Sequence, residues 1–563
     1  MPSEFRRGFV RILSNYTRLF ITVAFGLLIV RLVLQAAGSE GWGLVALFGS
    51  TIGFAAMFEE IIRQSMIREL GEAHHSGDEA RFRTTFNSAL CISAGAAAAG
   101  LAVFALLFAL APHFNIGDMV RGARHLIAAK GLEAVAAIAL APLFNMYLVT
   151  ERMVSYNFWV VMTDRVGDFA AAVAIVYIVP FDDPEDAIVA FAWITAAISI
   201  SCATLRAVMI VVMDRRLVPR LREARRSTIH GILHVGGWNA AVVAAMNLHL
   251  RFDAIIVNLF FGLSANAVFG FAVQLTSYTR RLTVGVTDGL DAVSARVSAG
   301  ARAGAVADLT RHSTRLHGLV AFPALFAIVV LTDPVLRLWL GDQISRRFDS
   351  PERAIAQAVL LIQILSIGIG VRSITDSWTR ILYGAGFVRS YARLVVVGGL
   401  CNPVLAILLV LVLPTEMLKL AGPALAFALL MFAVHGVGLS IAAARALRVG
   451  IGTLLGPLLR PLLAATACAP IILFGQALVE HWNAWELVVV LSVYGVGYFI
   501  SVLTFGITRE ERALVANAFA RRLRRRGVRE SGHHPREAAA SAGESVPKNP
   551  AGEGIPARDW TGP

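Results

Sequence analysis

Ionisable side chains recur inside segments of this sequence that are otherwise apolar. Arg251 and Asp253 lie two residues apart within the apolar segment 247–281, where we expect them to pair. Arg372 and Asp376 share another such segment, and their i,i+4 spacing places both side chains on one face of a helix. A charge at membrane depth costs several kcal/mol, about 2.5–3.5 for Arg at a helix centre on insertion scales. We therefore expect these residues to face one another or a water-filled cavity rather than lipid.

Further polar side chains occupy similar positions in other apolar segments. Asp164 and Asp168 are also spaced i,i+4, which places both carboxylates on one helix face. Arg31 lies in another apolar segment, and Gln274 and Arg280 lie further along the segment 247–281. The set predicts a cationic, water-filled cavity, because arginine stays charged and grips phosphate oxygens in a bidentate fork, while membrane-embedded acids act as proton relays or cation sites. The alternative is that each Arg–Asp pair neutralises itself and fixes neighbouring helices together.

Other charged residues lie close to the ends of their apolar segments. Lys130 and Glu133 belong to a segment that we expect to begin at Leu126. Long side chains at such positions extend their charged groups to the membrane–water interface. We therefore expect these two residues, like Glu59 and Glu60, to reach the interface.

The composition is that of a polytopic membrane protein. The chain has 563 residues, of which 57% are hydrophobic and 16% charged, and its mean hydropathy is +0.67. Ordinary soluble domains carry about 25% charged residues. The formal charge of +13 comes from arginines. Because these arginines concentrate in alternate connections between apolar segments, they set the membrane topology, and we expect no nucleic-acid binding.

Apolar runs of about 20 residues can cross the hydrocarbon core of a bilayer, and the sequence contains about fourteen of them. We predict an all-α integral membrane protein with two six-helix lobes, two accessory helices and, by the positive-inside rule, both termini in the cytoplasm. The predicted divisions are a basic N-terminus (1–18), an N-lobe (19–213), a basic cytoplasmic linker (214–231), a C-lobe (232–446), accessory helices (447–507), and a basic juxtamembrane segment with a disordered tail (508–563).

A weak internal repeat accompanies this division. An even number of spans in each lobe lets both lobes enter the membrane in the same direction, as in a parallel repeat. The segment RLVLQAAGSEGWGLVALFGS after the first run resembles VNLFFGLSANAVFGFAVQLTS after the seventh. Each passes through a turn rich in glycine and small residues, with an aromatic residue beside a glycine, at Trp42-Gly43 and Phe269-Gly270.

The sequence lacks the motifs of several enzyme classes. It contains no Gly-Lys dipeptide and therefore no Walker A loop, and it has neither a GxSxG elbow nor an HExxH pair. The four cysteines lie in apolar runs without metal-ligand spacing. We expect a secondary transporter rather than an enzyme, with no cofactor and no metal site.

Several segments resemble the polysaccharide transporter branch of the multidrug/oligosaccharidyl-lipid/polysaccharide exporter superfamily, which includes the Wzx-type flippases of lipid-linked oligosaccharides. RLVLQAAGSEGWGLVAL resembles the first hairpin of that family, and RFDAIIVNLFFGLSANAVFGFAVQLTSYTRRL resembles the start of its second lobe. LRLWLGD (336–342) resembles the end of its ninth helix. RILYGAGFVRSYARLVVVGGLCNPVLAILLVLVL (380–413) resembles its connection from the tenth to the eleventh helix. The likeness extends over residues 19–505.

The resemblance implies an ion-coupled, alternating-access flippase that moves an undecaprenyl-pyrophosphate-linked oligosaccharide or polysaccharide precursor across the bacterial inner membrane. The candidate substrate-binding residues are Arg31, Arg251, Arg372, Arg280 and Gln274. The candidate ion-coupling residues are Asp164, Asp168, Asp253 and Asp376, with a proton or sodium as the coupling ion. The expected partners are the lipid-linked saccharide, bacterial membrane lipids, and a glycan polymerase or ligase.

Other functions remain open. A multidrug–cation antiporter of the same superfamily would have an acidic and aromatic cavity, but the first apolar run lacks the acid that such antiporters often carry there. A peptidoglycan lipid II flippase shares the span count, yet its cluster of first-helix charges is represented here by Arg31 alone. A membrane glycan-synthesis enzyme would need larger extramembrane loops than those of this chain. A structural scaffold would tolerate the loss of buried charges.

Overall fold

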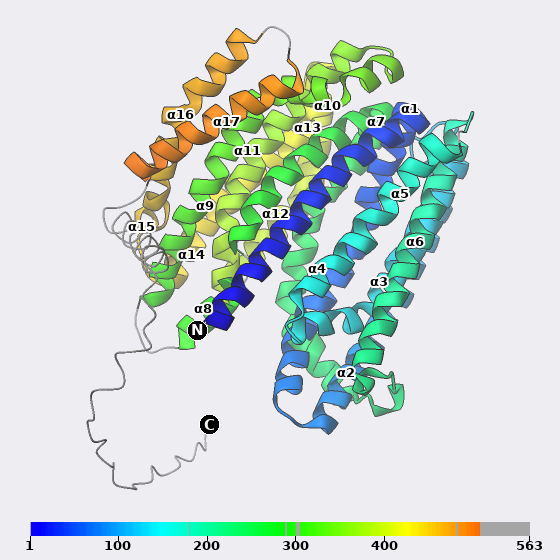
Figure 1. The fold of residues 1–563 in the computed structure, drawn as a ribbon, viewed down its shortest axis with the longest axis vertical. Coiled ribbons are helices and arrows are strands. Elements are labelled where there is room, and N and C mark those ends of the chain that lie inside the picture. Colours follow the sequence, from blue (N-terminus) through cyan, green and yellow to red (C-terminus); the bar gives the residue numbers. More distant parts are fainter. Residues whose placement is uncertain (1, 180, 288–289, 300–303, 480–481, 507–563) are drawn as a thin grey trace, which may run out of the picture. The chain divides into compact units, whose positions relative to one another are not determined.

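The computed structural model describes residues 2–179, 181–287, 290–299, 304–479 and 482–506, which are almost entirely helical (Figure 1). The predicted all-α fold class is confirmed. The predicted juxtamembrane segment and tail, 508–563, lie outside the described residues. The N-terminal helices are α1 (Pro2–His75), α2 (Glu79–Leu110), α3 (Val120–Val149), α4 (Met153–Val161), the π-helix η2 (Met162–Val166), α5 (Gly167–Val173), the π-helix η3 (Ala174–Ile178) and α6 (Pro184–Met213).

The chain then continues into a second set of helices. The C-terminal helices are α7 (Arg226–Thr287), α8 (Leu290–Ala299), α9 (Ala305–Val330), α10 (Thr332–Arg347), α11 (Pro351–Gly384), α12 (Val388–Val412), α13 (Glu416–Leu430), the π-helix η6 (Met431–Gly438) and α14 (Leu439–Leu447). The last described helices are α15 (Ile451–Leu455), η7 (Gly456–Leu458), α16 (Leu459–Leu478), α17 (Ala484–Ser501) and the π-helix η8 (Val502–Gly506).

The chain is a multi-pass membrane protein. Eleven helical segments of the described residues are long and apolar enough to cross a membrane. Two of these eleven bend sharply, at Gly38 in α1 and at Gly262 in α7, so each corresponds to more than one expected span. The expected fifth span is divided among the short elements α4, η2, α5 and η3. The count of about fourteen, the cytoplasmic termini and the six predicted divisions stay predictions.

The two bends have nearly the same backbone conformation. Gly38 has φ 70° and ψ −171°, and Gly262 has φ 79° and ψ −169°. Residues with a side chain rarely adopt this positive-φ conformation, so glycine is required at both bends. The bends fall in the two segments whose sequences resemble one another. The weak echo in the sequence therefore corresponds to two similarly bent pairs of helices.

The bent parts of α1 and α7 pack against each other. The hydroxyl oxygens of Ser39 and Ser264 lie 3.4 Å apart. A Cβ atom added at Gly43 would lie 2.0 Å from the carbonyl oxygen of Leu263, which is far inside contact distance. A glycine at position 43 therefore allows α1 and α7 to approach at this level of the membrane.

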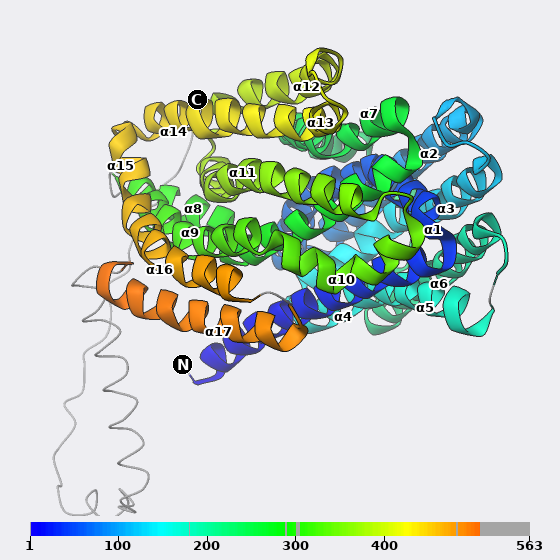
Figure 2. The same cartoon turned by 90° about the horizontal axis from the view of Figure 1, so that it is seen from above.

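The packing separates the N-terminal helices from the last helices of the chain. Helix α1 contacts α2, α3 and α5 and also runs against α7, while α11 contacts α7, α9 and α13. Helices α16 and α17 pack on each other, and α16 also packs on α9 (Figure 2). The outward surfaces are apolar: Leu411 is 63% exposed and Phe474 is 67% exposed. Such surfaces suit contact with lipid hydrocarbon.

Two π-helical segments carry polar residues that lie in the interior of the helix bundle. η2 carries Asp164 and Arg165, and η6 carries His435, which is fully buried. π-helical segments are rare and are frequent at functional sites. They shift the face on which the following residues lie, and an apolar sequence pattern does not reveal them.

Candidate functional site

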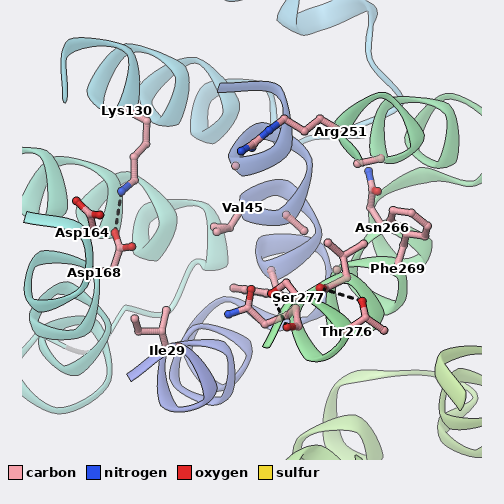
Figure 3. A pocket seen from close by; sticks show the side chains of 18 of the residues that line it. Ile29, Val45, Lys130, Asp164, Asp168, Arg251, Asn266, Phe269, Thr276 and Ser277 are labelled. Atoms are coloured by element: carbon pink, nitrogen blue, oxygen red, sulfur yellow. Dashed lines mark hydrogen bonds and ion pairs between the residues drawn. The ribbon is translucent and has the colours of Figure 1, made fainter. Parts of the chain in front are cut away.

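A cavity of about 690 Å³ lies between the N-terminal helices α1, α3 and α5 and the C-terminal helices α7 and α11. Figure 3 shows Lys130, Asp164 and Asp168 on one side of it and Arg251 entering from another. Of the nine predicted site residues, six line this cavity. They are Arg251, Arg280, Gln274, Asp164, Asp168 and Asp253.

The α7 wall carries two arginines that face the cavity. Arg251 donates from Nε to the side-chain oxygen of Asn247 at 2.9 Å. Arg281 lies over the ring of Tyr278, with its guanidinium carbon 5.9 Å from the ring centre. Within the described part of the chain, neither guanidinium has a carboxylate oxygen within 4.0 Å. Neither arginine therefore forms a close ion pair within the described residues, and the nearest acidic influence on Arg281 is the longer-range charge of Asp164.

A third α7 arginine is bound to α11. Arg280 donates from Nε and Nη2 to one carboxylate oxygen of Asp376, at 3.2 and 2.9 Å. The other oxygen of Asp376 faces Nε of Arg372 at 3.7 Å. Arg372 is only 5% exposed and Asp376 only 9%, so this group lies behind the cavity wall. The predicted Arg372–Asp376 pair is present, but Arg280 is the residue through which it reaches the cavity.

The expected pairing of Arg251 with Asp253 is wrong. Asp253 is 2% exposed and accepts a hydrogen bond at 2.8 Å from the side chain of Asn402 on α12. Each residue of an α-helix is rotated by about 100° from the last, so residues two apart point in nearly opposite directions. Arg251 instead reaches back one turn to Asn247.

The opposite wall contains an ion cluster on α3, η2 and α5. Lys130 Nζ donates to Asp168 Oδ1 at 2.7 Å and lies 3.1 Å from Glu133 Oε2. Arg165 Nη1 lies 4.0 Å from the second oxygen of Asp168. Asp164 accepts a hydrogen bond at 2.8 Å from the neighbouring Thr163 hydroxyl. Lys130, Glu133, Asp164, Arg165 and Asp168 all line the cavity.

The expectation that Lys130 and Glu133 reach the membrane interface is wrong. Helix α3 begins at Val120 rather than near Leu126, which places Lys130 about 15 Å along the helix at a rise of 1.5 Å per residue. Both side chains are about one fifth exposed and turn towards the cavity. The sequence did contain a signal: Lys130 lies four residues inside the apolar run that begins at Leu126, and Arg121 and Arg124 already flank that run with basic residues.

Arg31 does not lie among the residues that line the cavity. Its guanidinium is 3.3 Å from a carboxylate oxygen of Asp342 on α10, and both side chains are well exposed. A second contact between the same two helices lies close by, because the indole nitrogen of Trp339 on α10 donates to the backbone carbonyl of Leu27 on α1 at 2.9 Å. Arg31 thus connects α1 to α10 instead of contributing to the cavity wall.

Further contacts close the cavity at the end where the two glycine bends meet. The side chain of Asn258 on α7 exchanges two hydrogen bonds with the backbone of Asn115, of 3.1 and 2.9 Å. Trp42 and Phe269 line the cavity, and the indole of Trp42 stacks on Phe271 at 6.4 Å. These contacts join the N-terminal helices to α7 beside the two glycine bends.

The two walls differ in charge. The α3, η2 and α5 wall carries three carboxylates and two cations, while the α7 wall carries three arginines and the single acid Asp253. The expectation of a cationic cavity stays a prediction, since the lining carries five cations and four acids, distributed unevenly between the two walls. Cations dominate one side, and the excess of acids lies on the other.

The helical arrangement is similar to the folds of several solved membrane transporters. Lipid II flippase MurJ in an inward closed conformation is similar with a TM-score of 0.64 and 12% identity, over 87% of this chain and 98% of that one. An inward-facing multidrug resistance MATE transporter of the MOP superfamily is similar with a TM-score of 0.63 and 14% identity, over 78% of this chain and 99% of that one. A MATE transporter in complex with MaL6 has a TM-score of 0.56 at 12% identity, over 78% and 96%.

No protein-family model and no curated protein matches the sequence. At 12–14% identity the structural likeness establishes the fold. The more specific Wzx-type resemblance stays a prediction. The function therefore has to be inferred from the residues that line the cavity.

Proposed function

We propose that the chain is a secondary transporter that moves an undecaprenyl-pyrophosphate-linked saccharide precursor across a bacterial inner membrane by alternating access. The observation that carries the proposal is the pair of cavity-facing arginines on α7, Arg251 and Arg281, neither of which has a carboxylate oxygen within 4.0 Å among the described residues. A cation held away from bulk water is costly unless an anion accompanies it. A substrate with its own negative charge supplies that anion.

A diphosphate fits this wall better than a carboxylate does. Arg251 uses Nε for Asn247, so its two terminal nitrogens can form the paired hydrogen bonds that guanidinium makes to phosphate oxygens. Arg281 lies on the same helix and faces the same cavity. Gln274 adds an amide between these two positions in the chain, suited to phosphate or sugar oxygens.

The place of the cavity favours a lipid-linked substrate. It lies between helices of a multi-pass membrane protein, where a headgroup can enter while its hydrocarbon chain stays in the bilayer. Likeness to the lipid II flippase MurJ over 87% of the chain supports the same class of substrate. A peptidoglycan lipid II precursor is therefore an alternative cargo within this proposal.

The second candidate is a multidrug–cation antiporter. Glu133, Asp164 and Asp168 place three carboxylates on the cavity wall, and MATE multidrug transporters share the fold. Asp168 and Glu133, however, already hold Lys130, whereas Arg251 and Arg281 opposite have no carboxylate oxygen within 4.0 Å among the described residues. The charges that lack partners thus favour an anionic substrate over a cationic drug.

We propose Asp253 as the first candidate for ion coupling, with a proton or sodium as the ion. Asp253 lines the cavity, is almost fully buried, and has the amide of Asn402 but no cation beside it in the described residues. Such an acid is stable when it binds a proton or a cation. Asp164, Asp168 and Asp376 remain candidates in this role. A glycan polymerase or ligase would receive the product.

The proposal is tested in proteoliposomes that contain a lipid-linked oligosaccharide. The measurement is the fraction of saccharide accessible at the outer leaflet, with and without a proton or sodium gradient. Gradient-dependent movement is expected and identifies the coupling ion. Efflux of a cationic dye without movement of the saccharide would instead support the antiporter.

A further inference from the structure

We propose that Lys130 is a movable internal cation. When the substrate enters, the Lys130 ammonium moves away from Asp168 and Glu133 and binds the diphosphate of the substrate. A proton from the cytoplasm then replaces the ammonium on the Asp168 carboxylate. The inference rests on the proposed function and concerns the same cavity. It makes substrate binding and proton uptake one event. It also assigns a role to Lys130 that the position of this residue in the sequence did not predict.

The geometry around Lys130 is that of a shared counter-ion. Its ammonium lies 2.7 Å from Asp168 and 3.1 Å from Glu133, on two different helices. Each of the three side chains is between 21% and 23% exposed, so the cluster opens to the cavity. An anion in the cavity can therefore approach the ammonium without any movement of the helices.

The choice of lysine supports a mobile role. The chain has 51 basic residues, and only Lys130, Lys419 and Lys548 are lysines. An arginine would hold a carboxylate in a planar, bidentate pair, whereas a lysine is a compact charge on a flexible stem with rotatable donors. Lysine therefore suits a position whose side chain has to exchange one anion for another.

The charge balance of the cluster explains why the carboxylates would take up a proton after Lys130 moves away. Lys130 and Arg165 stand against Glu133, Asp164 and Asp168, which leaves one carboxylate in excess. If Lys130 turns to a diphosphate, two carboxylates are in excess at membrane depth. Adjacent acids in such surroundings bind a proton rather than remain ionised together.

The groups that face this cluster from other helices do not replace Lys130. On α7, Arg281 and Tyr278 interact electrostatically with Arg165, and Arg281 also interacts with Asp164 and with Arg18 of α1. Helix α6 contributes Phe191 to the cavity wall. Arg165 is 4.0 Å from Asp168 and remains its neighbour when Lys130 leaves. A proton is therefore needed for Glu133 and Asp168 together.

The test is calorimetric titration of the purified full-length protein with farnesyl pyrophosphate, in buffers that differ in ionisation enthalpy. When one ligand binds, wild type should take up about one proton more than Asp168→Asn does. Any change in the ionisation of the ligand is common to both proteins and cancels in this difference. The ratio of the wild-type affinity to the Asp168→Asn affinity should also fall by up to tenfold per pH unit as pH rises, because the ionisation of the ligand cancels in this ratio. Lys130→Ala should bind more weakly than wild type and should take up no more protons than Asp168→Asn.

The matched control is Glu416→Gln, which breaks the exposed Lys419–Glu416 pair away from the cavity and should behave as wild type. If Asp168→Asn does not fold, the double variant Lys130→Ala/Asp168→Asn removes both charges and should bind without proton uptake. Equal proton uptake by wild type and Asp168→Asn, with binding that still needs Arg251, overturns this inference alone. Binding that Arg251→Ala leaves unchanged, or no binding by wild type, overturns the proposed function.

Discussion

Arg280 on the cavity wall and Asp376 on α11 form a charged link between α7 and α11, with donor–acceptor distances of 3.2 and 2.9 Å. The same carboxylate is the acid nearest to the buried Arg372. Asp376→Ala therefore leaves a buried arginine uncompensated, and we expect it to lower the free energy of unfolding by about 3–5 kcal/mol. Unfolding in detergent measures the loss.

The control for this prediction is Asp342→Ala. Asp342 pairs with Arg31 at 3.3 Å, but both side chains are well exposed. Exposed pairs contribute about 0–1 kcal/mol, so this variant should remain close to wild type. Equal losses for the two variants would mean that the Asp376 group is not a buried structural unit.

Arg251→Ala should reduce transport strongly while the protein stays folded. Its partner in the structure is the amide of Asn247, so the substitution leaves no acid unpaired. A hydrogen bond to a charged group contributes about 1.5–3 kcal/mol, which corresponds to roughly a tenfold to hundredfold loss of affinity for the diphosphate. Titration with farnesyl pyrophosphate and the leaflet assay measure the two effects.

Arg346→Ala serves as the comparison for Arg251→Ala, because Arg346 is an exposed arginine of α10 outside the cavity. It should bind and transport as wild type does. A fall in yield or unfolding temperature for Arg251→Ala, without a specific loss of binding, would assign Arg251 a structural role.

Gly43→Ala should disfavour the close approach of α1 and α7 beside the two glycine bends. The added Cβ would meet the carbonyl of Leu263 at 2.0 Å, and α1 and α7 could not approach as they do here. Distances between spin labels on the two helices, measured by pulsed electron resonance, should lengthen. Gly49→Ala lies on the same helix with nothing within 4 Å of the added atom, and its distances should match wild type.

Asp253→Asn should separate binding from coupling. The amide has the same shape as the carboxylate and can keep a hydrogen bond to Asn402, so the fold and the arginine wall should persist. The substituted side chain cannot take up a proton. We expect farnesyl pyrophosphate to bind normally while the gradient no longer accelerates movement of the saccharide. Full acceleration in this variant would transfer the coupling role to another acid.

Much of the fold was predictable because each element is a long apolar run. The bilayer requires about 20 such residues in a helix, and the helices found fit this requirement. The bends at Gly38 and Gly262 also left a trace, in two similar glycine-rich segments. Helix ends were less predictable, since polar residues can continue a helix beyond its apolar part. The error at Lys130 came from such an end.

The partners within the site were not predictable from spacing. Asp253 pairs with Asn402, which is 149 positions away, and Arg31 meets Asp342 at a separation of 311. Local spacing suggested Arg251 as the partner of Asp253, although residues two apart on a helix point apart. Spacing succeeded for Arg372 and Asp376, because i,i+4 neighbours share a helix face.

The central claim is that Arg251 and Arg281 receive the diphosphate of a lipid-linked substrate. The most direct test is a cryo-electron microscopy structure of the protein with an undecaprenyl-pyrophosphate-linked saccharide. We predict diphosphate density within hydrogen-bond distance of both guanidinium groups, with Lys130 turned away from Asp168. A headgroup bound elsewhere, with both arginines unchanged and the Lys130–Asp168 pair intact, would contradict the account.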